Sequence, residues 1–164
     1  MSVTIRRYPI ILLLFTMTFV PMIAAQTLTI RLVNAKTGKP MKNKNVKVEF
    51  WWDDPSSPNN DKRTPINFLG TDVYIDKNSG VGHIEIPQQA TFVEVSEGSK
   101  IGKEPYRVAY ETCNAVGKQI PLADVLRLGY VPENTCSKSI KVKATAGEYV
   151  FFGLPIPWWW IDME

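Results

Sequence analysis

Residues 27–33 read Thr-Leu-Thr-Ile-Arg-Leu-Val, and residues 46–52 read Val-Lys-Val-Glu-Phe-Trp-Trp. Both segments alternate polar and apolar side chains, the pattern of a β-strand that lays one face on a core. Residues 36–40, Lys-Thr-Gly-Lys-Pro, carry the glycine and proline that mark a turn between them. The inner face of the second strand is expected to take Val46, Val48 and Phe50, with Trp52 next in the alternation. This stretch therefore predicts an all-β core.

The rest of the chain continues this pattern and adds one helix. Further strands are expected at 68–75, 81–86, 91–95, 106–110, 139–143 and 148–152. The segment Asp76-Lys77-Asn78-Ser79-Gly80 predicts a hairpin turn that ends in a left-handed glycine. Residues 121–128 have helical apolar spacing, with Pro121 suited to a first turn and Gly129 to the C-terminal cap. We expect an antiparallel β-sandwich of seven or eight strands with one short helix.

The only two cysteines, Cys113 and Cys136, flank that helix. In an oxidising compartment an isolated pair most often forms a disulfide, which would close the helical excursion at its base. A dithiol redox role or a metal role is the alternative. The spacing is far from Cys-x-x-Cys, and no second cysteine pair exists to complete a zinc site.

Residues 1–25 have the organisation of a secretory signal peptide. Arg6 and Arg7 precede an apolar run from Ile10 to Val20, and small residues at 24–25 suit a cleavage site before Gln26. The apolar run is shorter than the roughly 20 residues of a membrane span, although an uncleaved anchor remains the alternative. We therefore expect a β-sandwich domain over 26–154, a Trp-rich tail over 155–164 and a secreted or periplasmic protein.

Charge and composition exclude one large class of partner. Removing residues 1–25 takes away two basic residues and no acidic ones, so the balance becomes 17 minus 16, or +1. Lysine and arginine are scattered among acidic residues, which argues against nucleic-acid binding. The chain has no Asn-x-Ser/Thr acceptor and no cysteine near residue 25, which is compatible with a bacterial exported protein without a lipid anchor.

The N-terminal third resembles the transthyretin-like, carboxypeptidase-regulatory-like β-sandwich. The similarity rests on the strand 28–33, the turn 36–40, the strand 46–50, and the turn 76–80 that leads into 81–87. In that family a Thr-Gly-x-Pro turn joins the first two strands, and an Asp-to-Gly turn precedes a strand that ends in proline. The C-terminal half looks like that of small exported bacterial proteins, mostly uncharacterised, in which this sandwich carries an added helix. The resemblance implies that the β-sandwich is an accessory domain with a transthyretin-like or Ig-like fold.

Tryptophans are the strongest candidates for a functional surface. Five of them stand in two groups: Trp51, Trp52, Trp158, Trp159 and Trp160. Adjacent strand residues face opposite ways, so one of Trp51 and Trp52 is expected to point outward unless another segment covers it. Exposed tryptophan faces stack on sugars, bind cations or lie at membrane interfaces. The alternative is that the tail folds back and covers the sheet.

Catalytic and metal sites are weakly supported. His83 is the only histidine and shares a strand face with Glu85, without a recognisable nucleophile. One histidine is too few for the hydroxyisourate hydrolases or intradiol dioxygenases of related sandwiches, and the chain ends Asp-Met-Glu instead of the former's Tyr-Arg-Gly-Ser. The loop 53–61 could offer oxygen ligands to Ca²⁺, yet aspartate and asparagine are also common in metal-free turns.

These observations lead to one expected function and two alternatives. We expect an exported, non-enzymatic module that binds a cell-envelope protein or polysaccharide through its tryptophans and needs no cofactor. The first alternative is an assembly subunit that joins its neighbours, and so oligomerises, through a strand edge or the Trp tail. The second is a hydrolase that uses His83 or a pair of acidic residues.

Overall fold

The computed structural model describes residues 26–53, 63–66, 70–98, 110–115 and 117–156. The expected signal peptide, the tail tryptophans and residues 106–109 of an expected strand lie outside these ranges. Within them the chain forms β1 (Thr27–Asn34), β2 (Lys44–Asp53), β3 (Arg63–Pro65), β4 (Thr71–Ile75), β5 (Val81–Glu85), β6 (Phe92–Glu97), β7 (Tyr110–Thr112), β8 (Ile120–Pro121), α1 (Leu122–Leu128) and β9 (Glu148–Pro155).

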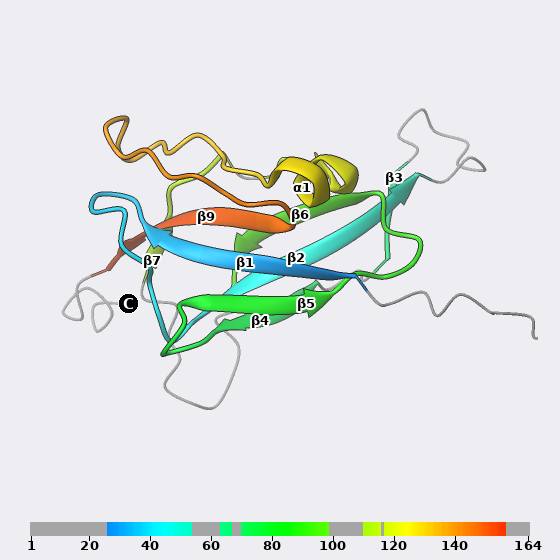
Figure 1. The fold of residues 1–164 in the computed structure, drawn as a ribbon, viewed down its shortest axis with the longest axis horizontal. Coiled ribbons are helices and arrows are strands. Elements are labelled where there is room, and N and C mark those ends of the chain that lie inside the picture. Colours follow the sequence, from blue (N-terminus) through cyan, green and yellow to red (C-terminus); the bar gives the residue numbers. More distant parts are fainter. Residues whose placement is uncertain (1–25, 54–62, 67–69, 99–109, 116, 157–164) are drawn as a thin grey trace, which may run out of the picture.

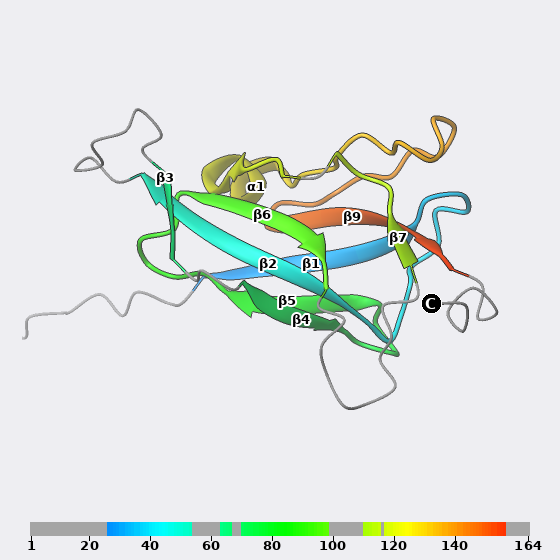
Figure 2. The ribbon, with the colours of Figure 1, turned by 180° about the vertical axis from the view of Figure 1, so that it is seen from behind.

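The strands form two sheets that lie one behind the other. Sheet A has the order β5-β1-β9-β7, and sheet B has the order β3-β2-β6-β8, with β4 also paired to β2. Figure 1 shows sheet A in front of β2 and β6, and Figure 2 shows the reverse. The all-β class with one short helix is therefore confirmed.

Sheet A is not purely antiparallel, contrary to the expectation. β9 pairs with β1 in parallel and with β7 in the antiparallel sense. A parallel neighbour needs a long connection, because the chain must return to the end from which the first strand started. The excursion that carries α1 lies between β7 and β9 and returns the chain to the end of the sheet at which β1 also begins.

The Asp76 turn is confirmed, but the expected hairpin is wrong. The Asp76 carboxylate accepts hydrogen bonds from the backbone N–H groups of Asn78 (2.9 Å) and Ser79 (2.8 Å), and Gly80 has φ 74°. The strands on either side nevertheless enter different sheets, since β4 pairs with β2 and β5 pairs with β1. Gly82 permits this crossing, because a Cβ there would lie 2.6 Å from Val73 Cγ1.

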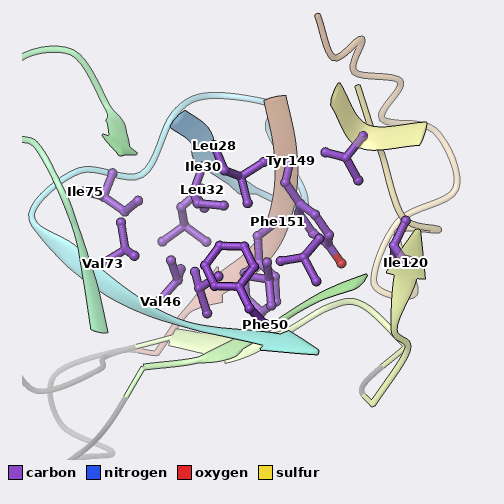
Figure 3. Packing of buried hydrophobic residues seen from close by; sticks show 14 of the residues in the cluster. Leu28, Ile30, Leu32, Val46, Phe50, Val73, Ile75, Ile120, Tyr149 and Phe151 are labelled. Atoms are coloured by element: carbon purple, nitrogen blue, oxygen red, sulfur yellow. The ribbon is translucent and has the colours of Figure 1, made fainter. Parts of the chain in front are cut away.

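The core fills the space between the sheets (Figure 3). Sheet A contributes Leu28, Ile30 and Leu32 from β1, each fully buried. Sheet B contributes Val46, Val48 and Phe50, the three inner residues expected for β2. Burial of each large side chain contributes about 1.5–3 kcal/mol before the entropy cost of ordering the chain.

Residues 131–145, which we call the covering segment, lie over part of the outer face of sheet A. Residues 139–143 form no strand; instead Ile140, Val142 and Ala144 pack on a second apolar cluster that includes Val150 and Phe152. β9 is consequently buried on both faces over residues 148–153. The expected strand at 139–143 is therefore wrong, because its alternation serves contact with the sheet and not pairing within it.

The disulfide and the helix are as expected. Cys113 and Cys136 are bonded, with their Cα atoms 5.4 Å apart, and α1 lies between them in the chain. α1 buries Leu122 and Val125 and ends at Gly129, whose φ is 74°. Leu128, the last apolar residue of the helical pattern, is 60% exposed.

The other strand boundaries differ from expectation at their ends. β4 begins at Thr71, with Gly70 before it at φ 66°, and residues 67–69 lie outside the described ranges. β3 and β8 are short strands that the pattern did not predict, because two or three residues show no alternation. Tyr110, the last residue of the strand expected at 106–110, begins β7.

Candidate functional site on the outer face of sheet B

A row of ring side chains crosses four strands on the face of sheet B that is turned away from the core. Trp51 in β2 lies opposite Pro65 in β3 on one side and Phe92 in β6 on the other. Phe92 in turn lies opposite Pro121 in β8. Their strand neighbours Phe50, Val93 and Ile120 are buried, which places the row on the outer face. We call Pro65, Trp51, Phe92 and Pro121 the ring row.

An arginine lies over the ring row. The Arg63 guanidinium carbon is 4.1 Å from the centre of the Phe92 ring, a cation–π contact. Arg63 Nη1 also donates a 2.9 Å hydrogen bond to Gln119 Oε1. The guanidinium is thus held by its stack on Phe92 and by the amide oxygen of Gln119.

Thr91 fixes the strand end that carries Trp51. Its backbone N–H donates to the Trp51 carbonyl (2.8 Å), and its hydroxyl accepts from the Asp53 N–H (3.1 Å). The indole N–H of Trp51 is buried, and it has no hydrogen-bond partner among the described residues.

The next row along the same face is acidic. Glu49 lies directly opposite Glu94, and Lys47 Nζ is 3.1 Å from Glu49 Oε1. Burial and the neighbouring Glu49 carboxylate raise the pKa of Glu94, although Lys47 acts in the opposite direction. The face therefore combines flat apolar rings with carboxylate oxygens that accept hydrogen bonds.

The structure separates the two strand tryptophans. Trp51 belongs to the outer face, whereas Trp52 follows Phe50 in the inner alternation and lies opposite Thr64. Both side chains are partly exposed. One of them therefore faces outward, as predicted from the alternation. Trp158, Trp159 and Trp160 lie outside the described residues.

Sequence reasoning found Trp51 but missed its neighbours. The alternation of β2 puts Trp51 and Glu49 on one face of that strand, and the alternation of β6 puts Phe92 and Glu94 on one face of its own strand. What the pattern could not supply was the register that brings the two strands side by side. Arg63 belongs to a three-residue strand and gave no signal of its own.

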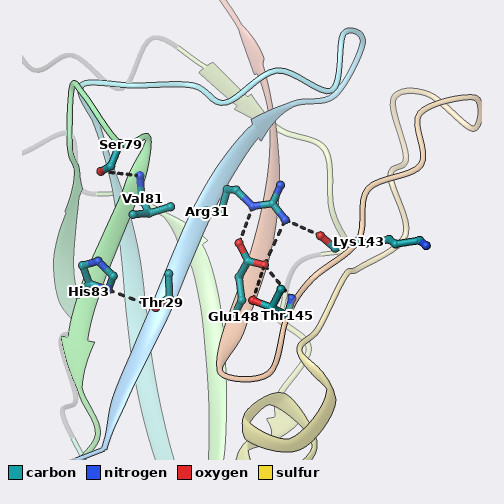
Figure 4. A network of polar contacts seen from close by, with 8 residues as sticks. All are labelled: Thr29, Arg31, Ser79, Val81, His83, Lys143, Thr145 and Glu148. Carbon is teal, nitrogen blue, oxygen red and sulfur yellow. Dashed lines mark hydrogen bonds and ion pairs between the residues drawn. The ribbon is translucent and has the colours of Figure 1, made fainter.

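His83 lies on the exposed outer face of sheet A (Figure 4). Its Nδ1 is 3.2 Å from the hydroxyl oxygen of Thr29. Beyond it, Arg31 Nε donates to Glu148 Oε1 at 2.5 Å, and Arg31 Nη2 donates to the Lys143 carbonyl. These contacts tie β1 to β9 and to the covering segment, which gives this network a structural role.

The acidic loop is only partly described. Asp53 is exposed at the end of β2, and residues 54–61 of the candidate calcium loop lie outside the described ranges. Among the residues that are described, no three His, Cys, Asp or Glu side chains gather in a way that could hold a metal ion. The described part of the chain also contains no apolar helix of the length needed to cross a membrane.

Comparison of the chain with protein-family models, with curated proteins and with solved structures found no match.

Proposed function

We propose that this chain is an exported, non-enzymatic module that binds a glycan on the outer face of sheet B. The ring row is the observation that carries the proposal. Four ring side chains stand side by side across β3, β2, β6 and β8. At a strand spacing of about 4.8 Å the row is about 14 Å long. Trp51 and the two prolines of the row suit the apolar faces of sugar rings, while Arg63 occupies one face of the Phe92 ring.

The polar groups beside the row support a sugar ligand over a purely apolar one. Glu49 and Glu94 offer carboxylate oxygens on one side of Trp51, and Arg63 offers guanidinium donors on the other. Sugars present apolar ring faces and a rim of hydroxyl groups that donate and accept hydrogen bonds. A ligand stacked on Trp51 would bring its hydroxyls toward both kinds of partner.

The wider assignment is part of the same proposal. We assign residues 1–25 to a signal peptide and the domain to a transthyretin-like, carboxypeptidase-regulatory-like sandwich. Two sheets around one core, the Asp76 turn and the Cys113–Cys136 disulfide support this assignment. Secretion from an expression host followed by N-terminal sequencing tests the export claim, with Gln26 expected as the first residue.

Co-sedimentation with insoluble polysaccharides tests the binding claim. The panel comprises peptidoglycan, cellulose, chitin and xylan, each mixed with the secreted, oxidised protein. We expect retention on at least one of them, lost in Trp51→Ala and kept in Tyr74→Ala. Tyr74 is a matched control, because it is an exposed ring on the same outer face opposite Asn45, about 20 Å along β2 from Trp51. No retention on any member, or equal loss in both variants, would contradict the proposal.

Assembly through a strand edge is the second candidate function, and one observation favours it. β5 is an edge strand of sheet A and pairs only with β1 among the described strands. An edge strand can accept a strand from another chain. Sedimentation velocity over a wide concentration range tests this idea: a reversible dimer would support it, whereas a monomer throughout would remove it.

A further inference from the structure

We propose a second ligand site on this protein, one that binds a small organic carboxylate with an apolar body. The site is a pocket on the outer side of sheet A, between β9 and the segment that covers it. Its volume is about 330 Å³. This lies at the small end of the range for small-molecule sites, so the ligand is compact.

Apolar residues make up half of the pocket lining. They are Phe152, Val131, Pro132, Ile140 and Val142. Phe152 belongs to β9 and is only 1% exposed, so it forms part of the sheet side of the pocket. The other four come from the covering segment, which runs beside β9 in Figure 1. An apolar body placed here would lie against the aliphatic residues of the covering segment.

The polar part of the lining favours an anion. Lys138 and Lys141 both line the pocket, and neither ammonium group has an ion-pair partner among the described residues. Glu133 is the single carboxylate in the lining, which leaves a net charge of +1 from two lysines and one glutamate. A ligand carboxylate near the two lysines would gain charge-assisted hydrogen bonds, whereas a ligand ammonium group would be repelled and would bind more weakly.

The sheet side of the pocket is fixed by hydrogen bonds to β9. Asn114 pairs with the backbone of Phe152 in both directions, since Phe152 N–H donates to Asn114 Oδ1 (3.0 Å) and Asn114 Nδ2 donates to the Phe152 carbonyl (3.1 Å). Cys113 N–H adds a further bond to the same carbonyl at 2.9 Å. Phe152 therefore holds its position whether or not a ligand is present.

The opposite side is fixed as well. The disulfide joins Cys136 to Cys113, and the Asn134 side chain donates to the Ala35 carbonyl (2.8 Å). Asn134 Oδ1 accepts from the backbone N–H groups of Cys136 and Ser137, both at 3.1 Å. A site whose two sides are held in place before binding loses little conformational entropy when the ligand enters.

Three ligands with one apolar body and different charge test the proposal. They are 1-naphthoate, 1-naphthylmethanol and 1-naphthylmethylammonium, titrated into the ¹⁵N-labelled, oxidised protein by NMR. We expect naphthoate to bind about tenfold more tightly than the alcohol and the ammonium to bind most weakly. The amide shifts are expected at residues 131–142 and at Phe152. Equal affinity for all three ligands, or shifts confined to other residues, would overturn the proposal.

A pair of double variants isolates the lysines. Lys138→Gln/Lys141→Gln is expected to reduce the affinity for naphthoate to that for the alcohol and to leave the alcohol unaffected. Lys77→Gln/Lys118→Gln makes the same charge change at two exposed lysines outside the pocket lining, and it is expected to bind naphthoate as the unmodified protein does. All four lysines are exposed, so the variants are expected to fold. Retention of full naphthoate affinity by the first pair, or an equal loss in the second, would contradict the site.

Discussion

Trp51 and Phe92 lie directly opposite each other in the antiparallel pair of β2 and β6, on the face of sheet B turned away from the core. Arg63 stacks over Phe92 at 4.1 Å, and the carboxylates of Glu49 and Glu94 occupy the next row. Directly opposed aromatic residues stabilise a strand pair by about 0.2–1 kcal/mol relative to two alanines. That gain is modest beside the roughly 1.5–3 kcal/mol from burial of a core side chain.

The ion pair between Arg31 and Glu148 is expected to make the free energy of unfolding depend on pH in the acidic range. Burial raises the pKa of Glu148, but the hydrogen bonds from Arg31 and Thr145 and the charge of Arg31 together lower it by more. The pKa of Glu148 therefore lies below its ordinary value. Such a carboxyl stabilises the fold above its unfolded pKa of about 4.3 and loses this contribution as the pH falls through the folded pKa. We expect Glu148→Gln to lower the free energy of unfolding by about 2 kcal/mol at neutral pH.

Urea unfolding at a series of pH values measures this effect. The difference between the unmodified protein and Glu148→Gln should shrink steadily as the pH falls below about 4. Asp124→Asn is the control, because its pair with Arg127 is 3.3 Å long and mostly exposed, and we expect less than about 0.5 kcal/mol there. A difference that stays constant with pH would contradict this account of Glu148.

Two glycines with nearly the same φ should respond differently to alanine. Gly129 and Gly147 have φ values of 74° and 76°, a conformation that costs an L-residue about 1–2 kcal/mol. A Cβ at Gly129 would also lie 2.3 Å from the carbonyl oxygen of Thr145, whereas no described atom lies within 4 Å of one at Gly147. Thermal unfolding should show that Gly129→Ala is the more destabilising by at least about 1 kcal/mol. Equal losses would mean that the contact at residue 129 relaxes freely.

The disulfide should contribute to stability through the loop it closes. Cys113 and Cys136 are 23 residues apart, for which the chain-entropy model gives about 3 kcal/mol. The double variant Cys113→Ser/Cys136→Ser is expected to unfold at correspondingly lower urea concentration than the oxidised protein. Reduced, unmodified protein serves as the comparison, and it should match the variant. Identical midpoints for the oxidised protein and the double variant would contradict the prediction.

Local patterns were sufficient for the elements that are defined by their own residues. Alternation predicted β1 and β2, and an apolar helical spacing ended by Gly129 predicted α1. The Asp76 turn followed from aspartate and glycine chemistry, and the disulfide followed from an isolated cysteine pair. Each of these features depends on a few neighbouring residues or on the number of cysteines, and both can be read directly from the sequence.

Pairing between distant strands could not be read in the same way. The parallel contact of β1 with β9 and the separation of β4 from β5 depend on which sheet each strand joins. Residues 139–143 show the same limit, because an alternating segment can cover a sheet as well as enter it. The ring row was hidden for this reason: Trp51 was identified as a candidate, but Phe92, Arg63 and Pro121 become its neighbours only through register.

The most direct test of the proposed glycan site follows the Trp51 indole N–H by NMR while oligosaccharides are added. Soluble fragments of peptidoglycan, cellulose, chitin and xylan are titrated separately into the ¹⁵N-labelled, oxidised protein. The account predicts a saturable shift of the Trp51 indole and of the Phe92 amide with at least one fragment, and little change at Tyr74. Unchanged Trp51 and Phe92 signals with every fragment, or binding that shifts only residues away from the ring row, would contradict it.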